Sequence, residues 1–181
     1  MKLLSKKLVS LSLTHCGTPL GMDARWTKKH GKSYFGYKVS ANADKRYKLV
    51  RKIKVSTASE HDTNHFEDVL DPANTNRNIL ADKGYVDSER EARLGKQGWR
   101  MHIQRKGIKD QPISDTQQRR NRRIAKTRAR IEHVFAGMAQ MGGKALRSIG
   151  LARATLHLNW KVAAYNLQRL VYLKEARVEA F

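Results

Sequence analysis

Residues 119–141 read RRNRRIAKTRARIEHVFAGMAQM, and this stretch decides how the second half of the chain folds. It contains no proline and one glycine, and its large apolar side chains recur at spacings of seven, four and three residues: Ile124, Ile131, Phe135 and Met138. This spacing predicts an amphipathic helix that buries one stripe of side chains. Seven of the twelve residues from Arg119 to Arg130 are lysine or arginine, so we expect the exposed side of the helix to be cationic.

Glu132 is the single acid among thirteen lysines and arginines between Thr116 and Lys174. On a helix it lies at the edge of the apolar stripe, one turn beyond Arg128. One interpretation is a surface ion pair with Arg128, which would stabilise the helix by only about 0.2–0.5 kcal/mol. The other is a carboxylate that holds a divalent cation against a bound phosphate. The residue pattern by itself favours the ion pair.

The chain has 181 residues, a formal net charge of +21 and a pI near 10.5. This charge predicts a polyanionic partner, DNA or RNA ahead of an acidic membrane, because no segment is apolar enough to span a bilayer. A single cysteine, Cys16, excludes an internal disulfide and a cysteine-based zinc site. Lys6 and Lys7 interrupt the apolar run at the N-terminus, so we reject a secretion signal and expect a cytoplasmic protein.

The remaining patterns predict an α/β fold. Residues 1–22 are weakly patterned, end in a turn-rich segment and are expected to be weakly ordered. Alternation of apolar and polar residues predicts an antiparallel hairpin of strands at 33–41 and 49–55. Further elements are expected as a short helix at 61–70, a buried strand at 78–81, a helix at 88–95, a strand at 100–104, and a last helix at about 151–176 with Leu156, Trp160, Ala163, Leu167 and Leu170 on one face. This order predicts a mixed sheet with an antiparallel hairpin at one side, flanked by helices.

Asp82 directly follows the predicted buried strand at 78–81. Ligand sites of α/β sheets collect at the carboxyl ends of strands, whereas Asp-x-Gly is also typical of an ordinary turn, and the two interpretations are equally supported. Two carboxylates from different elements, Asp82 and Glu132, could share a hard cation in a basic groove. Two such ions can hold the attacking and leaving oxygens of a phosphodiester transfer.

Several other polar and aromatic residues carry weaker signals. His61-Asp62 suits the start of a helix better than a role beside a metal site. Trp26, Tyr34, Tyr37 and Tyr85 lie among basic residues and could stack on bases, although packing is the simpler role for each. Asp23 fits a surface or turn position, and His133 lacks the neighbours of a zinc site.

Three blocks resemble the catalytic domain of insertion-sequence-five family transposases, which belong to the DDE group of bacterial mobile elements. They are DARWTKKHGKSYFGYK at 23–38, ILADKGYVD at 79–87 and RARIEHVFAGMAQMGGKALRSIGLARA at 128–154, the last followed by NWKVAAYNLQRL at 159–170. The resemblance implies a ribonuclease H-like fold whose three acids bind two magnesium ions and drive DNA cleavage and strand transfer at transposon ends. Asp82 matches the family's second acid, Glu132 its third, and Arg128 the arginine four residues before it.

The chain departs from this family at its start. The family's first catalytic aspartate lies on the first strand, upstream of the block that begins at Asp23, and residues 1–22 contain no Asp or Glu. We therefore expect the first strand to be missing and the DDE domain, assigned to residues 23–176 before a tail at 177–181, to be truncated and incomplete. Ala139 also stands where much of the wider group has lysine or arginine.

Two hypotheses of function follow. The leading one is an insertion-sequence DNA transposase in a truncated form, with a magnesium site at Asp82 and Glu132 that lacks its third acid and supports little strand transfer. The alternative is a non-catalytic DNA-binding remnant or regulator. Under both hypotheses we expect transposon ends and target DNA as partners, and a homodimer is a further candidate. The expected contacts to DNA come from seven residues of the basic helix: Arg119, Arg120, Arg122, Arg123, Lys126, Arg128 and Arg130. A ribosomal type of RNA-binding protein suits the charge but not the three blocks.

Overall fold

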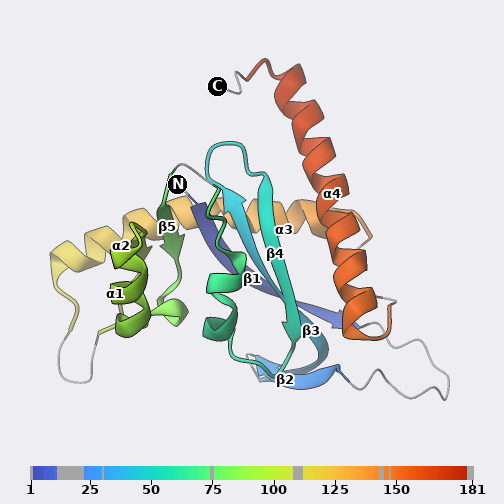
Figure 1. The fold of residues 1–181 in the computed structure, drawn as a ribbon, viewed down its shortest axis with the longest axis horizontal. Coiled ribbons are helices and arrows are strands. Elements are labelled where there is room, and N and C mark those ends of the chain that lie inside the picture. The colour runs from blue at the N-terminus through green and yellow to red at the C-terminus, as the bar shows by residue number, and fades with distance from the viewer. Residues whose placement is uncertain are drawn as a thin grey trace.

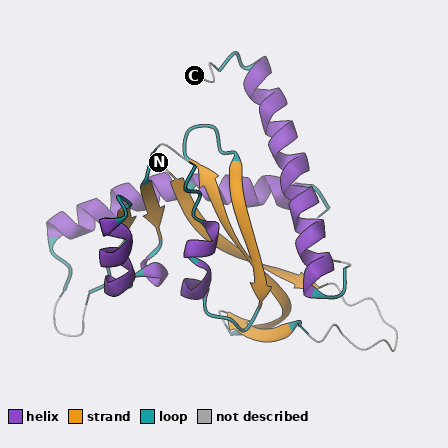
Figure 2. Cartoon of the chain, viewed as in Figure 1, coloured by secondary structure: helices purple, strands orange, loops and turns teal. Residues whose placement is uncertain are grey.

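A computed structural model describes residues 2–11, 23–29, 31–73, 76–107, 112–142, 145–146 and 148–178. Within these residues one twisted sheet is surrounded by helices (Figure 2). Two long helical segments, at the back and at the right of the view, pack against a sheet that carries short helices on its other side (Figure 1). The predicted α/β class is therefore confirmed.

The sheet has seven strands, and its main path runs in the order β2-β3-β1-β5-β6. The strands are β1 (Lys2–Leu11), β2 (Arg25–Lys29), β3 (Lys32–Asp44), β4 (Val50–Thr57), β5 (Asn78–Ala81), β6 (Arg100–Ile103) and β7 (Ala145–Leu146). β3 runs antiparallel to β1, β2 and β4, whereas β1, β5 and β6 are parallel. The predicted hairpin is β3 and β4, with Val39 paired to Val55.

β1 lies in the middle of this sheet, between β3 and β5. The prediction that the first strand is missing is wrong, because residues expected to be weakly ordered form ten residues of strand. The segment KLLSKKLVSL lacks a clear alternation, and its backbone is paired by partners distant in sequence: Leu4 with Asn42 of β3, and Leu3 with Leu80 of β5. Residues 12–22 were also expected to be weakly ordered, and they lie outside the described residues.

At β5 the sheet is buried on both faces. Leu80 belongs to a core formed with the long helices, whereas its neighbours Ile79 and Ala81 belong to a second core on the other face. This alternation is what the period of a strand dictates, and it explains why β5 is a continuous apolar run. The helices around the sheet are α1 (Ser88–Lys96), α2 (Asp115–Arg128), α3 (Arg130–Gln140) and α4 (Leu151–Glu175), with 3-10 helices η1 (Asp62–His65), η2 (Glu67–Val69) and η3 (Lys83–Tyr85).

The helix predicted at 61–70 is replaced by η1 and η2. Three apolar residues of this segment, Phe66, Val69 and Leu70, all enter the second core, and two short turns present them to it. His61 begins η1, as predicted, with its Nδ1 accepting a hydrogen bond from the backbone N–H of Thr63 at 3.4 Å.

The basic helix is divided at Ala129 into α2 and α3. Ala129 keeps helical dihedral angles, so the chain continues in nearly the same direction (Figure 1). The backbone N–H of Glu132 donates to Ala129 O three residues earlier, which tightens this turn locally. The predicted stripe is confirmed, since Ile124, Ile131, Phe135 and Met138 are all buried.

α4 packs against the edge of the sheet at β4. The side chain of Asn166 bonds both backbone groups of Val50, accepting from its N–H at 2.9 Å and donating to its carbonyl at 2.8 Å. At the other end of the helix, the carboxylate of Asp23 accepts the backbone N–H of Leu151 at 3.2 Å. Asp23 is exposed, as predicted, but it also caps a helix 128 residues away in sequence. No described helix is both long and apolar enough to cross a membrane.

We predict that Gly137→Ala lowers the free energy of unfolding by about 1–3 kcal/mol. An added Cβ on α3 would lie 2.7 Å from Cε2 of Tyr165 on α4, and Tyr165 is buried with its hydroxyl bonded to Lys48 O. Gly95→Ala in α1 is the matched control: no atom lies within 4 Å of its added Cβ, so alanine should stabilise the helix there by about 0.5–1 kcal/mol. Urea denaturation measures both, and equal effects would contradict the close approach of α3 and α4.

Candidate functional site

Asp82 lies at the carboxyl end of β5, where the sequence predicted it. It is the N-cap of η3, and its Oδ1 accepts the backbone N–H of Lys83 at 2.7 Å. Its Oδ2 lies 3.8 Å from Nη2 of Arg128, and 41% of its side chain is exposed. The turn interpretation and the site interpretation of Asp82 are therefore compatible, because one oxygen serves the turn and the other faces the basic helix.

Arg128 is the last residue of α2, and Glu132 lies in the first turn of α3. The sequence suggested Arg128 as an ion-pair partner of Glu132. In the structure, the guanidinium of Arg128 faces Asp82, the other predicted acid. Glu132 is exposed and stands one helical turn, about 6 Å of rise, beyond Arg128. Arg128 therefore contacts one predicted acid and precedes the other by one helical turn.

The described residues do not form a complete metal centre, since they contain no group of three His, Cys, Asp or Glu side chains that could hold a metal ion. Asp82 already bonds a backbone N–H and faces a permanently charged guanidinium. β1, which runs beside β5, has the sequence KLLSKKLVSL and supplies no acid. Two carboxylates and a competing arginine do not fit the converging oxygen ligands that a magnesium site requires.

Tyr85 and Arg90 position the loop that carries Asp82. Burial raises the pKa of the Tyr85 hydroxyl to about 12, so it stays protonated, and this hydroxyl lies beside Ser40 of β3. Arg90 is 7% exposed; its guanidinium donates to Thr63 O at 2.6 Å and to Tyr85 O at 3.3 Å, and its carbon Cζ lies 4.8 Å from the centroid of the Phe66 ring. Sequence reasoning missed Ser40 and Arg90. The alternation in β3 assigned Ser40 to the polar side of the strand, whereas Ser40 is buried.

The seven cations predicted to bind DNA fall into two groups. Three contact the protein: Arg120 donates to Ile103 O at 3.0 Å, Arg128 faces Asp82, and Arg130 donates to Lys45 O at 3.2 Å. The other four are exposed and recur at helical spacings of three and four residues, so they share one side of α2. We call this group the α2 cationic stripe: Arg119, Arg122, Arg123 and Lys126.

The four aromatic residues considered for base stacking differ in exposure. Tyr37 and Tyr85 are buried, and Tyr34 is partly buried. Trp26 on β2 is 65% exposed, with its ring centroid 5.2 Å from that of Phe35. Trp26 is therefore the member of this set that a nucleobase could reach.

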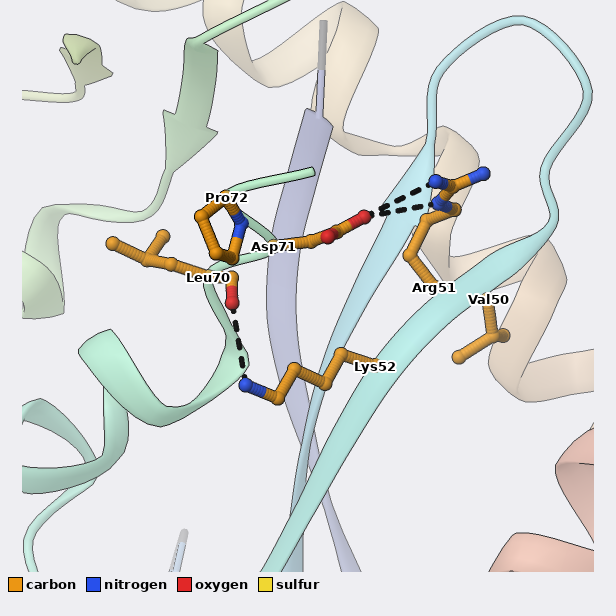
Figure 3. Close-up of a pocket in the computed structure, with 6 residues that line it drawn as sticks. All are labelled: Val50, Arg51, Lys52, Leu70, Asp71 and Pro72. Carbon is orange, nitrogen blue, oxygen red and sulfur yellow. Dashed lines mark hydrogen bonds and ion pairs between the residues drawn. The ribbon is translucent and has the colours of Figure 1, made fainter. Parts of the chain in front are cut away.

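A shallow hollow of about 360 Å³ between β4 and the segment after η2 lies apart from these residues (Figure 3). Its acid, Asp71, accepts from Nε and Nη2 of Arg51 at 3.2 and 3.1 Å, and Lys52 Nζ donates to Leu70 O at 3.3 Å. These bonds fasten the segment after η2 to β4. The hollow is therefore a structural contact rather than a second candidate site.

Comparison with known proteins agrees with the resemblance in the sequence. Residues 10–167 match a family model described as "Transposase DDE domain". A curated relative, "Transposase for insertion sequence element IS1106" of Neisseria meningitidis serogroup B, is 30% identical over 146 residues, which is 80% of this chain and 50% of the relative. The chain thus spans half the length of that relative. No solved structure matches it.

We predict that the Tyr85 hydroxyl hydrogen-bonds Ser40, and that Tyr85→Phe therefore lowers the free energy of unfolding by about 1–2 kcal/mol at neutral pH. Since the folded pKa of about 12 exceeds the ordinary 10, the unfolded chain releases this proton first. The stability contributed by Tyr85 is therefore full below pH 10 and is lost as pH rises toward 12.

Urea denaturation between pH 7 and 11 checks this, with Tyr172→Phe, which removes an exposed hydroxyl, as the control. A double-mutant cycle with Ser40→Ala isolates the hydrogen bond. Additive effects of the two substitutions would show that the Tyr85 and Ser40 hydroxyls do not interact.

Proposed function

Because this chain belongs to the transposase DDE domain family, we propose that it acts on DNA as part of an insertion-sequence transposase and holds the DNA along α2. The observation that carries the proposal is the α2 cationic stripe, four exposed cations on one side of a helix whose next turn delivers Arg128 to Asp82.

The sheet supports the ribonuclease H-like fold that the resemblance implies. Its central strand β1 has an antiparallel neighbour, β3, on one side and parallel strands, β5 and β6, on the other. In this arrangement Asp82 follows β5 immediately beside the central strand, and the helix with Glu132 crosses the same region. We propose residues 23–176 as the DDE domain, with β1 joined to the same sheet.

Contacts between the stripe and phosphates would be electrostatic and independent of base sequence. Arg and Lys side chains release condensed counterions when they neutralise phosphates, so the affinity should fall steeply with salt. Trp26, exposed near Lys28 and Lys32 on the β2–β3 hairpin, is the proposed stacking residue for an unpaired base at a DNA end.

We predict that Arg122→Gln combined with Lys126→Gln reduces the slope of log affinity against log salt by about 2 for duplex DNA, because two phosphate contacts are lost. Fluorescence anisotropy across a salt series measures the slope. Arg153→Gln with Lys174→Gln, an equal change of charge on exposed α4 positions, is the control and should leave the slope unchanged. Equal slopes for both double variants, or a strong preference for structured RNA, would contradict binding of DNA along α2.

Family membership implies dependence on a divalent metal in general. In this chain Asp82 and Glu132 are the residues that would contribute oxygen ligands, and the described residues supply no third acid near them. Arg128 also competes with a cation for Asp82. We therefore propose that this chain alone binds DNA without joining it, and that cleavage and strand transfer need a further carboxylate.

We predict no joining of a transposon-end oligonucleotide to target DNA by the purified chain in magnesium or manganese. A gel assay with a labelled end measures it, and anisotropy on the same preparation confirms that DNA is bound. Strand transfer that is abolished by Asp82→Ala, but kept by Glu89→Ala at an exposed position of α1, would overturn the proposal. A regulator that competes at transposon ends remains the alternative, and metal-dependent cleavage separates the two because both bind DNA.

A further inference from the structure

α4 presents an uncovered apolar face to solvent. The helix buries Ala154, Leu158 and Tyr165 against the rest of the chain, and its C-terminal half stands clear of the sheet (Figure 1). On the outward side, Trp160 is 69% exposed, Leu167 65% and Leu156 59%, and Leu170 and Val171 are at least half exposed. Single exposed apolar residues are ordinary, but a continuous row on a strongly charged chain marks an interaction surface.

The spacing of this face points to another helix as its occupant. Leu156, Trp160, Ala163, Leu167 and Leu170 recur at intervals of four, three, four and three residues. That alternation is the heptad pattern of a seam between two packed helices. It runs for about 21 Å along α4, long enough for two helices to interlock side chains over several turns.

The charges fit a second copy of the same chain. In a chain with a net charge of +21, two like molecules should repel one another, yet no Lys or Arg occupies the seam or its flanking positions between Leu156 and Val171. Lys161 and Arg169, the cations within this stretch, fall outside the seam and its flanks. The one surface of the helix that is free of like charge is therefore the apolar one.

We propose that this chain forms a symmetric dimer through antiparallel packing of α4 on α4 of a second copy. The two-fold axis would pass between Ala163 and Ala164, so that small side chains lie where the two helices cross. It would also place Trp160 of each copy against Leu167 of the other. The same axis sets Arg153 of each helix level with Lys174 of the partner, and the neighbouring Glu175 is the acid that offsets these two cations. A parallel pair would instead set Arg153 against Arg153 and Lys174 against Lys174. The inference rests on α4 alone and does not depend on DNA binding.

Light scattering and sedimentation equilibrium on the full chain test the dimer. The expected mass is twice 20.7 kDa, and Leu167→Glu should raise the dimer dissociation constant about 30-fold or more, the effect of losing a central interface residue. Trp160→Ala should also weaken it, whereas Trp26→Ala, which removes an equally exposed tryptophan from β2, should not. Leu167 is exposed in the monomer, so circular dichroism should show Leu167→Glu to be folded.

Cross-linking tests the orientation in a Cys16→Ser background, which removes the single native cysteine. Oxidation should link two copies of Ala163→Cys across the axis, and it should not link two copies of Leu156→Cys, which only a parallel pair would bring together. A monomer at all concentrations, a dimer that Leu167→Glu leaves unchanged, or efficient linking of Leu156→Cys would overturn the proposal.

Discussion

Burial of the apolar stripe on α2 and α3 is the constraint on which the rest of the arrangement depends. Ile124 and Ile131 must face the sheet, so the cations interleaved with them are distributed by helical geometry alone. Those on the far side become the exposed α2 cationic stripe. Arg120 and Arg128, at the edges of the buried side, reach backbone and carboxylate groups of the sheet instead. One packing interaction thus fixes both the charged surface and the contact with Asp82.

Asp82 gains its position from the sheet rather than from its own local sequence. β5 is short and buried on both faces, so its end is fixed by two cores at once. The turn that follows is held by the buried ring of Tyr85, which packs against Phe66, and by Arg90, which donates to the Tyr85 carbonyl. An acid is useful to phosphate chemistry only when such supports keep its carboxylate in place.

The periodicity of apolar residues correctly predicted the elements that local sequence determines. These are the β3–β4 hairpin, β5, α1 and the buried stripe that ends near Met138. It could not predict β1, whose strand pairing comes from β3 and β5 rather than from any alternation of its own. Nor could it find the cap that Asp23 provides for α4, since 128 residues separate the two groups. For the candidate site, the sequence predicted the individual acids and cations, while the division of the cations into exposed and anchored groups required the packed structure.

α4 shows why an apolar face read from sequence does not identify its partner. Both sides of this helix carry apolar residues, and periodicity singled out the row with Leu156, Trp160 and Leu167. The chain packs the opposite side, with Ala154, Leu158 and Tyr165, while Asn166 at the border of that side bonds both backbone groups of Val50 on β4. These bonds cover backbone groups of an edge strand that could otherwise pair with another chain. The heptad row is left on the surface, and its charge-free flanks suit it to a copy of itself.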